Sequence, residues 1–343
     1  AGARLYKALA DRSIVLTEPE AAKLHAVPGD MSQPNLGLKD HDLQHLVSCL
    51  TCVIHSAWAV NFNLGVRSFE QQHIRGTYNL INICLRSHLP SPARFFFCSS
   101  VSAAGNTPKP ASIPETIIED LEHAQRTGYG RSKLVTEHIT RNAMRQTGMQ
   151  ARVLRIGQLG GDTVGAQWND TEAVALMFRS ALTTGALPEL NERPSWLPVD
   201  QCGRAISDIA MNVSGSADLN MVYHLVNPRT FSWKDDLLPA LRQGSALAEF
   251  EVVPPQEWLS RLATSEQDPE KNPSVKLIDF WRSKYASHGL SETGPGRNEE
   301  AGLTFETERT VQDCPSLGLV EDPVASGLIQ RYIESWMSRW AGE

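Results

Sequence analysis

The chain has 343 residues, of which 41% are hydrophobic and 21% charged, and its formal net charge is -7. This length allows two domains, or one domain with an elaborated lobe, and the composition is typical of a soluble globular protein. The sequence shows no basic stripe for nucleic acid, no apolar run near the roughly 18 residues of a membrane span, and no secretory signal at its start. Of six cysteines, only Cys49 and Cys52 form a C-x-x-C pair. We therefore expect reduced thiols in a cytoplasmic protein, and no metal site.

Predicted helices and strands alternate along the first half of the chain. Apolar periodicity and β-branched runs predict them, in chain order, as a helix at 3–14, a strand at 25–31, a helix at 43–50, a strand at 51–60, a helix at 68–88, a strand at 93–105, a helix at 127–148 and a strand at 151–161. On the helix at 68–88, we expect Ile74, Tyr78, Ile81 and Leu85 to share one buried face. Such alternation is typical of parallel βαβ units.

The pattern is looser in the second half. We expect a helix within 169–188, a helix that starts near Asp200, and a strand at 221–228. From residue 231 onwards the chain is mostly helical, with a polar loop at 287–302.

Small and polar residues follow three of the predicted strands, at 55–61, 99–105 and 157–162. Ligands of parallel α/β sheets bind outside the carboxyl ends of the strands. The sequence therefore predicts a site at this edge of the sheet.

The segment TGYGRSKLVTEHI, residues 127–139, places Tyr129 four residues before Lys133. Positions i and i+4 share a helix face, so the two side chains point the same way. A nearby ammonium lowers the pKa of a phenol, which is usually about 10, and a tyrosine tuned in this way can exchange a proton near neutral pH. This suits hydride chemistry at a carbonyl, whose oxygen must receive a proton. Because the spacing alone is a weak signal, its place after a strand that ends in two serines matters.

A hydroxyl at the end of the strand at 93–105 would hold the carbonyl oxygen. Ser100 is the candidate, and Ser99 is its rival. Because side chains alternate along a strand, we expect one serine to face the site and the other to face the backbone.

Segments on both sides of the motif resemble one family. VIHSAWAVNF and HIRGTYNLINICL resemble its ribose-binding strand, loop and following helix, and FFFCSSVSAAG resembles its catalytic strand. The segments that resemble its R-P-G-Q-x-x-G-D stretch and its substrate lobe are RIGQLGGD, SWLPVDQCGRAI, YHLVNP and NPSVKLIDFW. The chain thus resembles the thioester reductase domain of the extended short-chain dehydrogenase/reductase superfamily, as found in fungal nonribosomal-peptide-synthetase-like carboxylate reductases and aminoadipate reductases. Sugar epimerases and steroid dehydrogenases share the tyrosine and the lysine. The segments from RIGQLGGD onwards are therefore the ones that distinguish this family from them.

This resemblance implies NADPH-dependent release of an acyl thioester as an aldehyde, with further reduction to the alcohol left open. The acyl group would arrive on a phosphopantetheinylated carrier protein, an upstream domain of the same natural polypeptide. By this resemblance Tyr129 donates the proton, Lys133 tunes it and binds the nicotinamide ribose, and Ser100 polarises the carbonyl. The resemblance further implies cofactor contacts at Asp30 near the adenine, at Ser56, Ala57, Trp58 and Val60 around the ribose, and at Gly157, with Gln158 beside the nicotinamide or the acyl group.

The resemblance also implies the architecture. We expect a Rossmann-type doubly wound parallel sheet in an NADP-binding domain at 1–227, with substrate-lobe insertions around 162–200, and a smaller, mainly helical lobe at 228–343. Two departures from the family stand out. The sequence holds no G-x-x-G-x-x-G turn for the pyrophosphate, so we expect a chain that lacks its first two strands and binds NADPH weakly. His73 stands where many relatives carry asparagine, which puts a proton relay through that position in doubt.

Several candidates have a purely structural alternative. Asp30 suits the turn of a Gly-Asp sequence, Trp58 suits the core, and His55 suits a satisfied core histidine. Asp200 suits the N-cap of its helix or, alternatively, the acyl channel. We expect the remaining tryptophans of the C-terminal helices to form the core of the lobe, namely Trp258, Trp281, Trp336 and Trp340.

Three rival functions also stay open. The chain could be a stand-alone reductase of small carbonyl compounds, or a module that cyclises its thioester without hydride. It could also be a degenerate fragment that only docks a carrier protein.

Overall fold

The computed structural model describes residues 1–212, 222–244, 247, 249–285 and 302–341. The chain forms two compact units, each assembled from separate stretches. The first unit comprises Ala1–Gly157, Gly203–Val226 and Leu303–Gly318, and the second comprises Gln158–Cys202, Asn227–Gly302 and Leu319–Glu343. The predicted domains, in contrast, are consecutive along the chain, and their boundaries stay a prediction.

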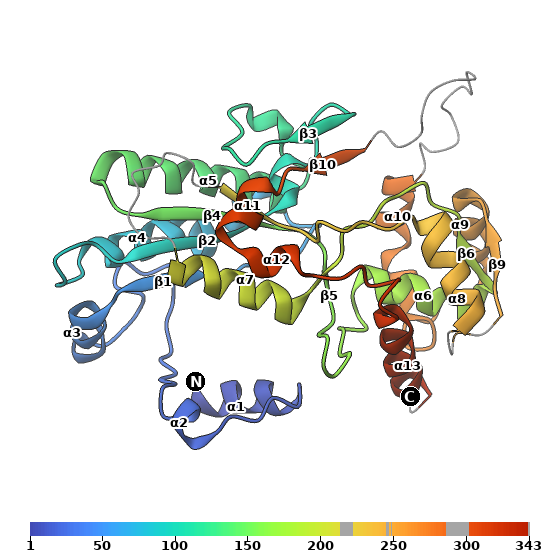
Figure 1. Ribbon diagram of the computed structural model, residues 1–343, viewed down its shortest axis with the longest axis horizontal. Coiled ribbons are helices and arrows are strands. Elements are labelled where there is room, and N and C mark those ends of the chain that lie inside the picture. Colours follow the sequence, from blue (N-terminus) through green and yellow to red (C-terminus); the bar gives the residue numbers. More distant parts are fainter. Residues whose placement is uncertain (213–221, 245–246, 248, 286–301, 342–343) are drawn as a thin grey trace. The chain divides into compact units, whose positions relative to one another are not determined.

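A parallel sheet forms the centre of the first unit (Figure 1). Its strands, in the order β1-β2-β4-β8, are β1 (Cys52–His55), β2 (Arg94–Ser100), β4 (Ala151–Ile156) and β8 (Val222–Leu225). In the register of the sheet Val53 lies beside Phe95, and Phe97 lies beside Val153. From Phe95 to Ser100 every residue of β2 is buried, as expected for a strand covered on both faces. The predicted α/β fold with a parallel sheet is confirmed.

Helices α4 (Arg75–Leu85) and α5 (Gly128–Thr147) pack on this sheet (Figure 1). Ile81 and Cys84 of α4 lie with Phe95, Phe97 and Val153 in one apolar cluster, against which Ile139 and Met144 of α5 also pack. Helix α5 ends as predicted, because Gly148 adopts the left-handed conformation of a C-cap with a φ of 72°. The other short elements of the unit are α1 (Gly2–Ala10), α2 (Glu18–Ala21), α3 (Asp40–Cys49), η1 (Val66–Phe69), η2 (Glu70–Ile74), η3 (Val101–Ala104), η4 (Leu121–His123) and most of α7 (Val199–Asn212).

Residues 303–318 return to the first unit late in the chain. Strand β10 (Leu303–Phe305) pairs in parallel with β3 (Ala111–Ile113), and α11 (Glu308–Asp313) and α12 (Pro315–Gly318) follow. The Oγ1 atom of Thr310 accepts a hydrogen bond from the His224 backbone N–H at 2.9 Å, which ties α11 to strand β8.

Two predictions about this unit are wrong. Residues 25–31 form no strand, because they pair with no strand in the described part of the chain and because residues 25–29 are exposed. The stretch runs into a turn in which the Asp30 N–H donates to the Leu36 carbonyl. Tyr78 is 57% exposed, whereas Ile81 is 3% exposed. The buried face of α4 includes Asn79 instead, whose amide donates to the backbone carbonyls of Met31 and Gln33. A polar side chain that finds backbone acceptors can be buried at little cost, and apolar spacing alone does not reveal it.

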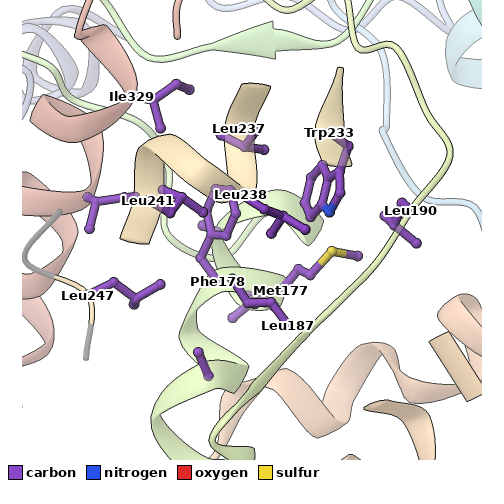
Figure 2. Packing of buried hydrophobic residues seen from close by; sticks show 14 of the residues in the cluster. Met177, Phe178, Leu187, Leu190, Trp233, Leu237, Leu238, Leu241, Leu247 and Ile329 are labelled. Carbon is purple, nitrogen blue, oxygen red and sulfur yellow. The ribbon is translucent and has the colours of Figure 1, made fainter. Parts of the chain in front are cut away.

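The second unit is mainly helical, with two short parallel strand pairs. Its elements are β5 (Leu159–Gly160), α6 (Ala173–Thr184), β6 (Ala186–Pro188), β7 (Leu197–Pro198), η5 (Trp233–Leu237), α8 (Leu238–Gly244), β9 (Glu251–Val253), α9 (Pro255–Thr264), η6 (Pro273–Leu277), α10 (Ile278–Tyr285) and α13 (Leu328–Trp340). Phe178 stacks on Trp233 with ring centroids 5.8 Å apart, inside the apolar cluster of Figure 2. The four C-terminal tryptophans named above are buried in the same cluster, as predicted.

Two further expectations concern this unit. Asp200 lies in the first turn of α7 rather than before it, and its carboxylate accepts hydrogen bonds from the Thr163 amide and hydroxyl. It therefore links a loop to the helix and is not the predicted N-cap. The polar loop predicted at 287–302 lies outside the described residues, apart from Gly302. Across the described part of the chain, no helix is both long and apolar enough to cross a membrane.

The exposure of α4 gives a first test. We expect Ile81→Ala to lower the free energy of unfolding by about 2–5 kcal/mol, because it leaves a cavity in the cluster against the sheet. Tyr78→Ala, one turn away on the exposed face, should change it by no more than about 0.5 kcal/mol. Urea unfolding followed by circular dichroism measures both, and comparable losses in the two variants would contradict the assigned face.

Candidate active site

The start of α5 is held close to two other segments. Thr127 caps the helix, and its Oγ1 atom accepts a hydrogen bond from the Gly130 N–H at 3.1 Å. A Cβ atom on Gly128 would meet the Leu64 carbonyl and lie 2.6 Å from the Val66 nitrogen. A Cβ atom on Gly130 would lie 2.9 Å from the carbonyl oxygen of Ser102. The glycines of TGYG thus allow the close approach that sets the position of the tyrosine between them.

Tyr129 is buried beside the end of β2. It is 8% exposed, and the ring of Phe62 meets it edge-on at 5.3 Å. Burial raises the pKa of Tyr129, and the nearby Ser100 hydroxyl offsets this only in part. The lowered pKa expected from the sequence is therefore wrong for this structure. A buried phenol next to a hydroxyl keeps its proton and can donate it.

Lys133 lies one turn further along α5 and is 3% exposed. Its Nζ atom donates to the Cys98 carbonyl at 2.7 Å and lies 4.3 Å from the ring centroid of Trp58 and 4.9 Å from that of Phe97. Burial lowers the pKa of Lys133 to about 7, although the charges of Cys98 and Glu137 oppose this. An ammonium is thus held at the predicted edge of the sheet by one carbonyl and two aromatic faces.

The two serines at the end of β2 have different partners. The Ser100 side chain lowers the pKa of Tyr129, and its Oγ atom accepts a hydrogen bond from the Ser102 N–H at 3.1 Å. Ser99 donates to a carboxylate oxygen of Glu137 at 2.6 Å. The geometry favours Ser100 as the serine of the site, and Ser99 binds a buried carboxylate rather than the backbone.

The loop after β1 contacts Lys133 through the ring of Trp58. Trp58 is half-buried and donates from its indole N–H to the Ser132 hydroxyl at 3.3 Å, while Ser56, Ala57 and Val60 are exposed. The ring of His73 lies 4.8 Å from that of Trp58. His73 therefore supports the loop expected to bind the cofactor.

His55, at the end of β1, is buried. Burial and the nearby ammonium of Lys133 lower the pKa of His55 to about 4. His55 is thus a buried, neutral histidine, but the expectation that it is satisfied is wrong, because its Nε2 atom has no hydrogen-bond partner among the described residues.

The structure supports the remaining candidates unequally. The Asp30 carboxylate accepts bonds from the amide and hydroxyl of Ser32 and from Gln72, and these bonds lower the pKa of Asp30. This is the capping turn named as its alternative, and its adenine contact stays a prediction. Gly157 must be small, since a Cβ there would lie 2.9 Å from Val226 Cγ1. Gln158 belongs to the second unit, where its amide donates to the Leu159 carbonyl at 2.8 Å, so its role beside the site stays a prediction.

Sequence reasoning missed the residues that surround the trio. Phe69 and Phe62 pack on Tyr129, and Glu137 and Arg155 form a buried ion pair of 2.7 Å beneath it. The position of Glu137 one helical turn after Lys133 could have indicated a buried carboxylate near the lysine. Among the described residues, no cluster of His, Cys, Asp or Glu could hold a metal ion.

A parallel α/β sheet with a serine, a buried tyrosine and a buried lysine at the carboxyl end of β2 defines a class, the proteins with an NAD-binding fold. The chain belongs to the NAD-binding family described as male sterility protein, whose model matches residues 1–206. It is 31% identical to the non-reducing polyketide synthase sor2 of Hypocrea jecorina, over 97% of this chain and 12% of that protein. It is also 31% identical to the adenylate-forming reductase Nps10 of Heterobasidion annosum, over 98% of this chain and 30% of that protein.

Among solved structures, the chain is similar to the terminal R domain from the myxalamid PKS-NRPS biosynthetic pathway. That match has a TM-score of 0.78 at 24% identity and covers 97% of this chain and 80% of that one, which shows a shared fold. The predicted resemblance to reductase domains of this kind is confirmed. The chain spans only 12% and 30% of the length of these two curated relatives.

The close approach at the start of α5 gives a second test. Gly128→Ala should destabilise the chain by about 1–3 kcal/mol, because the new methyl group collides with backbone that cannot rotate away. Gly203→Ala, inside α7 with open space around it, should instead add about 0.5–1 kcal/mol. Thermal unfolding compares the two variants, and equal shifts would contradict the tight contact.

The buried lysine gives a third test. Unfolded Lys133 keeps its proton up to its ordinary pKa of 10.5, whereas the folded chain loses it above about 7. Because the unfolded state binds more protons in this window, stability should rise with pH from about 7 to 9, by up to about 1.4 kcal/mol per pH unit. Above pH 9 the buried thiols of Cys84 and Cys98, with pKa values raised to about 12 and 11, act in the opposite direction.

Urea unfolding at several pH values measures this slope. Lys133→Met should remove it, whereas Lys7→Met, at an exposed position, should leave it in place. A slope that persists in Lys133→Met would show that Lys133 is not the titrating group.

Proposed function

We propose that this chain reduces an acyl thioester on the phosphopantetheine arm of a carrier protein to an aldehyde, with NADPH as reductant. The observation that carries the proposal is the trio of Ser100, Tyr129 and Lys133 at the carboxyl end of β2. The names of the relatives support it, since they include an adenylate-forming reductase and a polyketide synthase. The carrier would belong to the same polypeptide in the cytoplasm, and the natural setting would be secondary metabolism.

The residues around Lys133 fit the nicotinamide half of the cofactor. An ammonium has three donors, and among the described residues one acceptor is recorded for Lys133, the Cys98 carbonyl. Donors are left for ribose hydroxyls, and Gly157 keeps the end of β4 free of a side chain. We propose that Lys133, Ser56, Ala57, Trp58, Val60, Gly157 and Asp30 hold the cofactor. When bound, NADPH supplies a hydride to the carbonyl carbon.

Side chains of the protein polarise and protonate the carbonyl oxygen of the thioester. Ser100 donates a hydrogen bond that polarises the thioester carbonyl, and Tyr129 gives its proton to the oxygen as negative charge develops there. The hemithioacetal then collapses, the carbon–sulfur bond breaks, and the sulfur leaves with a proton as free thiol. In balance, the thioester, NADPH and one proton become aldehyde, thiol and NADP⁺. Lys133 stabilises the phenolate that Tyr129 becomes.

The proposal predicts that Tyr129→Phe lowers kcat by about a hundredfold or more, because the proton donor is lost. The protein is expressed from its complete reading frame and mixed with NADPH and an acyl thioester on a phosphopantetheinylated carrier, and the loss of NADPH absorbance is followed. Tyr78→Phe, on the exposed face of α4, is the matched control and should retain full activity.

The other outcomes separate the rivals. No oxidation with any acyl thioester, together with retained carrier binding, would sink the proposal and favour a docking module. Faster turnover of a small free ketone would favour a stand-alone carbonyl reductase. Release of the acyl group without any loss of NADPH absorbance would favour a cyclising module.

A further inference from the structure

A buried network of hydrogen-bonded side chains, formed by Ser99, Glu137, Arg155 and His224, lies next to the proposed site. Ser99 Oγ donates to Glu137 Oε1 at 2.6 Å. Arg155 binds the same carboxylate with one edge of its guanidinium, donating from Nε to Oε1 at 3.1 Å and from Nη2 to Oε2 at 2.7 Å. The side chains of Glu137 and Arg155 are both fully buried. Three elements, β2, α5 and β4, therefore meet at one carboxylate.

The network continues from Arg155 to a neutral histidine, His224. His224 Nδ1 lies 2.7 Å from the Glu306 carbonyl, which can only accept, so Nδ1 carries the proton. Nε2 then accepts from Arg155 Nη1 at 3.3 Å. Burial and the charge of Arg155 lower the pKa of His224 to about 3, which keeps the ring in this form. Arg155 is thus held from two sides, by Glu137 and by His224.

Such a network is a poor way to gain stability. Desolvating two charges costs several kcal/mol per ion, and well-packed apolar residues of similar volume are often equally stable or better. Position in the sequence points to another role. Ser99 directly precedes Ser100, and Glu137 follows Lys133 by one helical turn on the same face. Each member of the proposed catalytic trio is thus next to a member of the network or on the helix that carries one.

We propose that Glu137 is a positioning residue, which, through Arg155 and Ser99, fixes α5 against β2 and β4 so that Tyr129 and Lys133 stay aligned with Ser100. This inference rests on the proposed function. The titratable groups around Lys133 are Cys98 on β2, His55 on β1, His73 on η2, and Tyr129 and Glu137 on α5. Glu137 is the one carboxylate among these described groups. Its charge therefore also favours the ammonium form of Lys133.

The experiment separates positioning from stability. Glu137→Leu combined with Arg155→Met removes the ion pair without leaving a lone buried charge, and Ser99→Ala removes only the hydroxyl. Arg141→Met is the matched control. Arg141 also lies on α5, and its substitution breaks a different ion pair, the one with Glu119. Each variant is measured by thermal unfolding, by thioester reduction, and by an NMR titration of ¹³Cε-labelled Lys133, assigned with Lys133→Arg. The titration requires no turnover, so it can be read even if the proposed activity is absent.

We expect the double variant to melt within a few degrees of the unsubstituted chain, while kcat falls about tenfold or more and KM for NADPH changes little, because alignment rather than binding is lost. The Lys133 titration should move to lower pH in the double variant and stay unchanged in Arg141→Met. Ser99→Ala should lower kcat about threefold, the effect of one hydrogen bond.

Unchanged kcat and an unchanged Lys133 titration in the double variant would overturn the proposal. If the double variant does not fold, Ser99→Ala decides, and full activity there would overturn it. If the unsubstituted chain shows no reductase activity, the proposed function fails, and the titration still shows whether Glu137 acts on Lys133.

Discussion

The burial of one ammonium group, that of Lys133, is the constraint on which the rest of the site depends. Taking such a charge out of water costs several kcal/mol, which nearby groups must offset. The Cys98 carbonyl at 2.7 Å and the faces of Trp58 and Phe97 offset part of it. These groups belong to β2 and to the loop after β1, so both must stand where they do for α5 to pack on the sheet. The contacts that offset the cost of burying Lys133 are therefore also the contacts that form the candidate site.

The same burial acts on the two titratable side chains in opposite directions. It lowers the pKa of Lys133 to about 7 and raises that of Tyr129. Each shift favours the neutral form, so the tyrosine begins as a proton donor and not as a phenolate. In the proposed reaction, once Tyr129 has released its proton, the phenolate and the lysine ammonium stabilise each other at a buried position. The activating charge thus has its effect after the proton moves, where the transition state forms, rather than in the resting protein.

Local patterns were enough to predict the parallel sheet, the extent of α5 and the placement of Tyr129 and Lys133 one turn apart on that helix. Alternating apolar runs and the stop at Gly148 each rest on a few neighbouring residues. What the sequence did not reveal depends on residues far apart in the chain. The carboxylate of Glu137 is met by Ser99 and Arg155 only because three elements converge, and Tyr78 is exposed because Asn79 finds acceptors at Met31 and Gln33. Residues 25–31 failed as a strand for the same reason, since an extended segment becomes a strand only with a partner.

The chemistry proposed for the trio also limits what the trio can discriminate. A thioester and a ketone each need one proton at the carbonyl oxygen, and Ser100 and Tyr129 offer the same help to both. The leaving thiol is a weak acid, with a pKa of about 8.5 for an ordinary thiol, so the sulfur can depart from the hemithioacetal without a dedicated acid. Nothing in the second half of the reaction then calls for a further group beside Tyr129. Selection of a carrier-bound acyl chain over a small ketone must therefore come from residues that hold the rest of the substrate, and substitutions that alter this choice should lie outside Ser100, Tyr129 and Lys133.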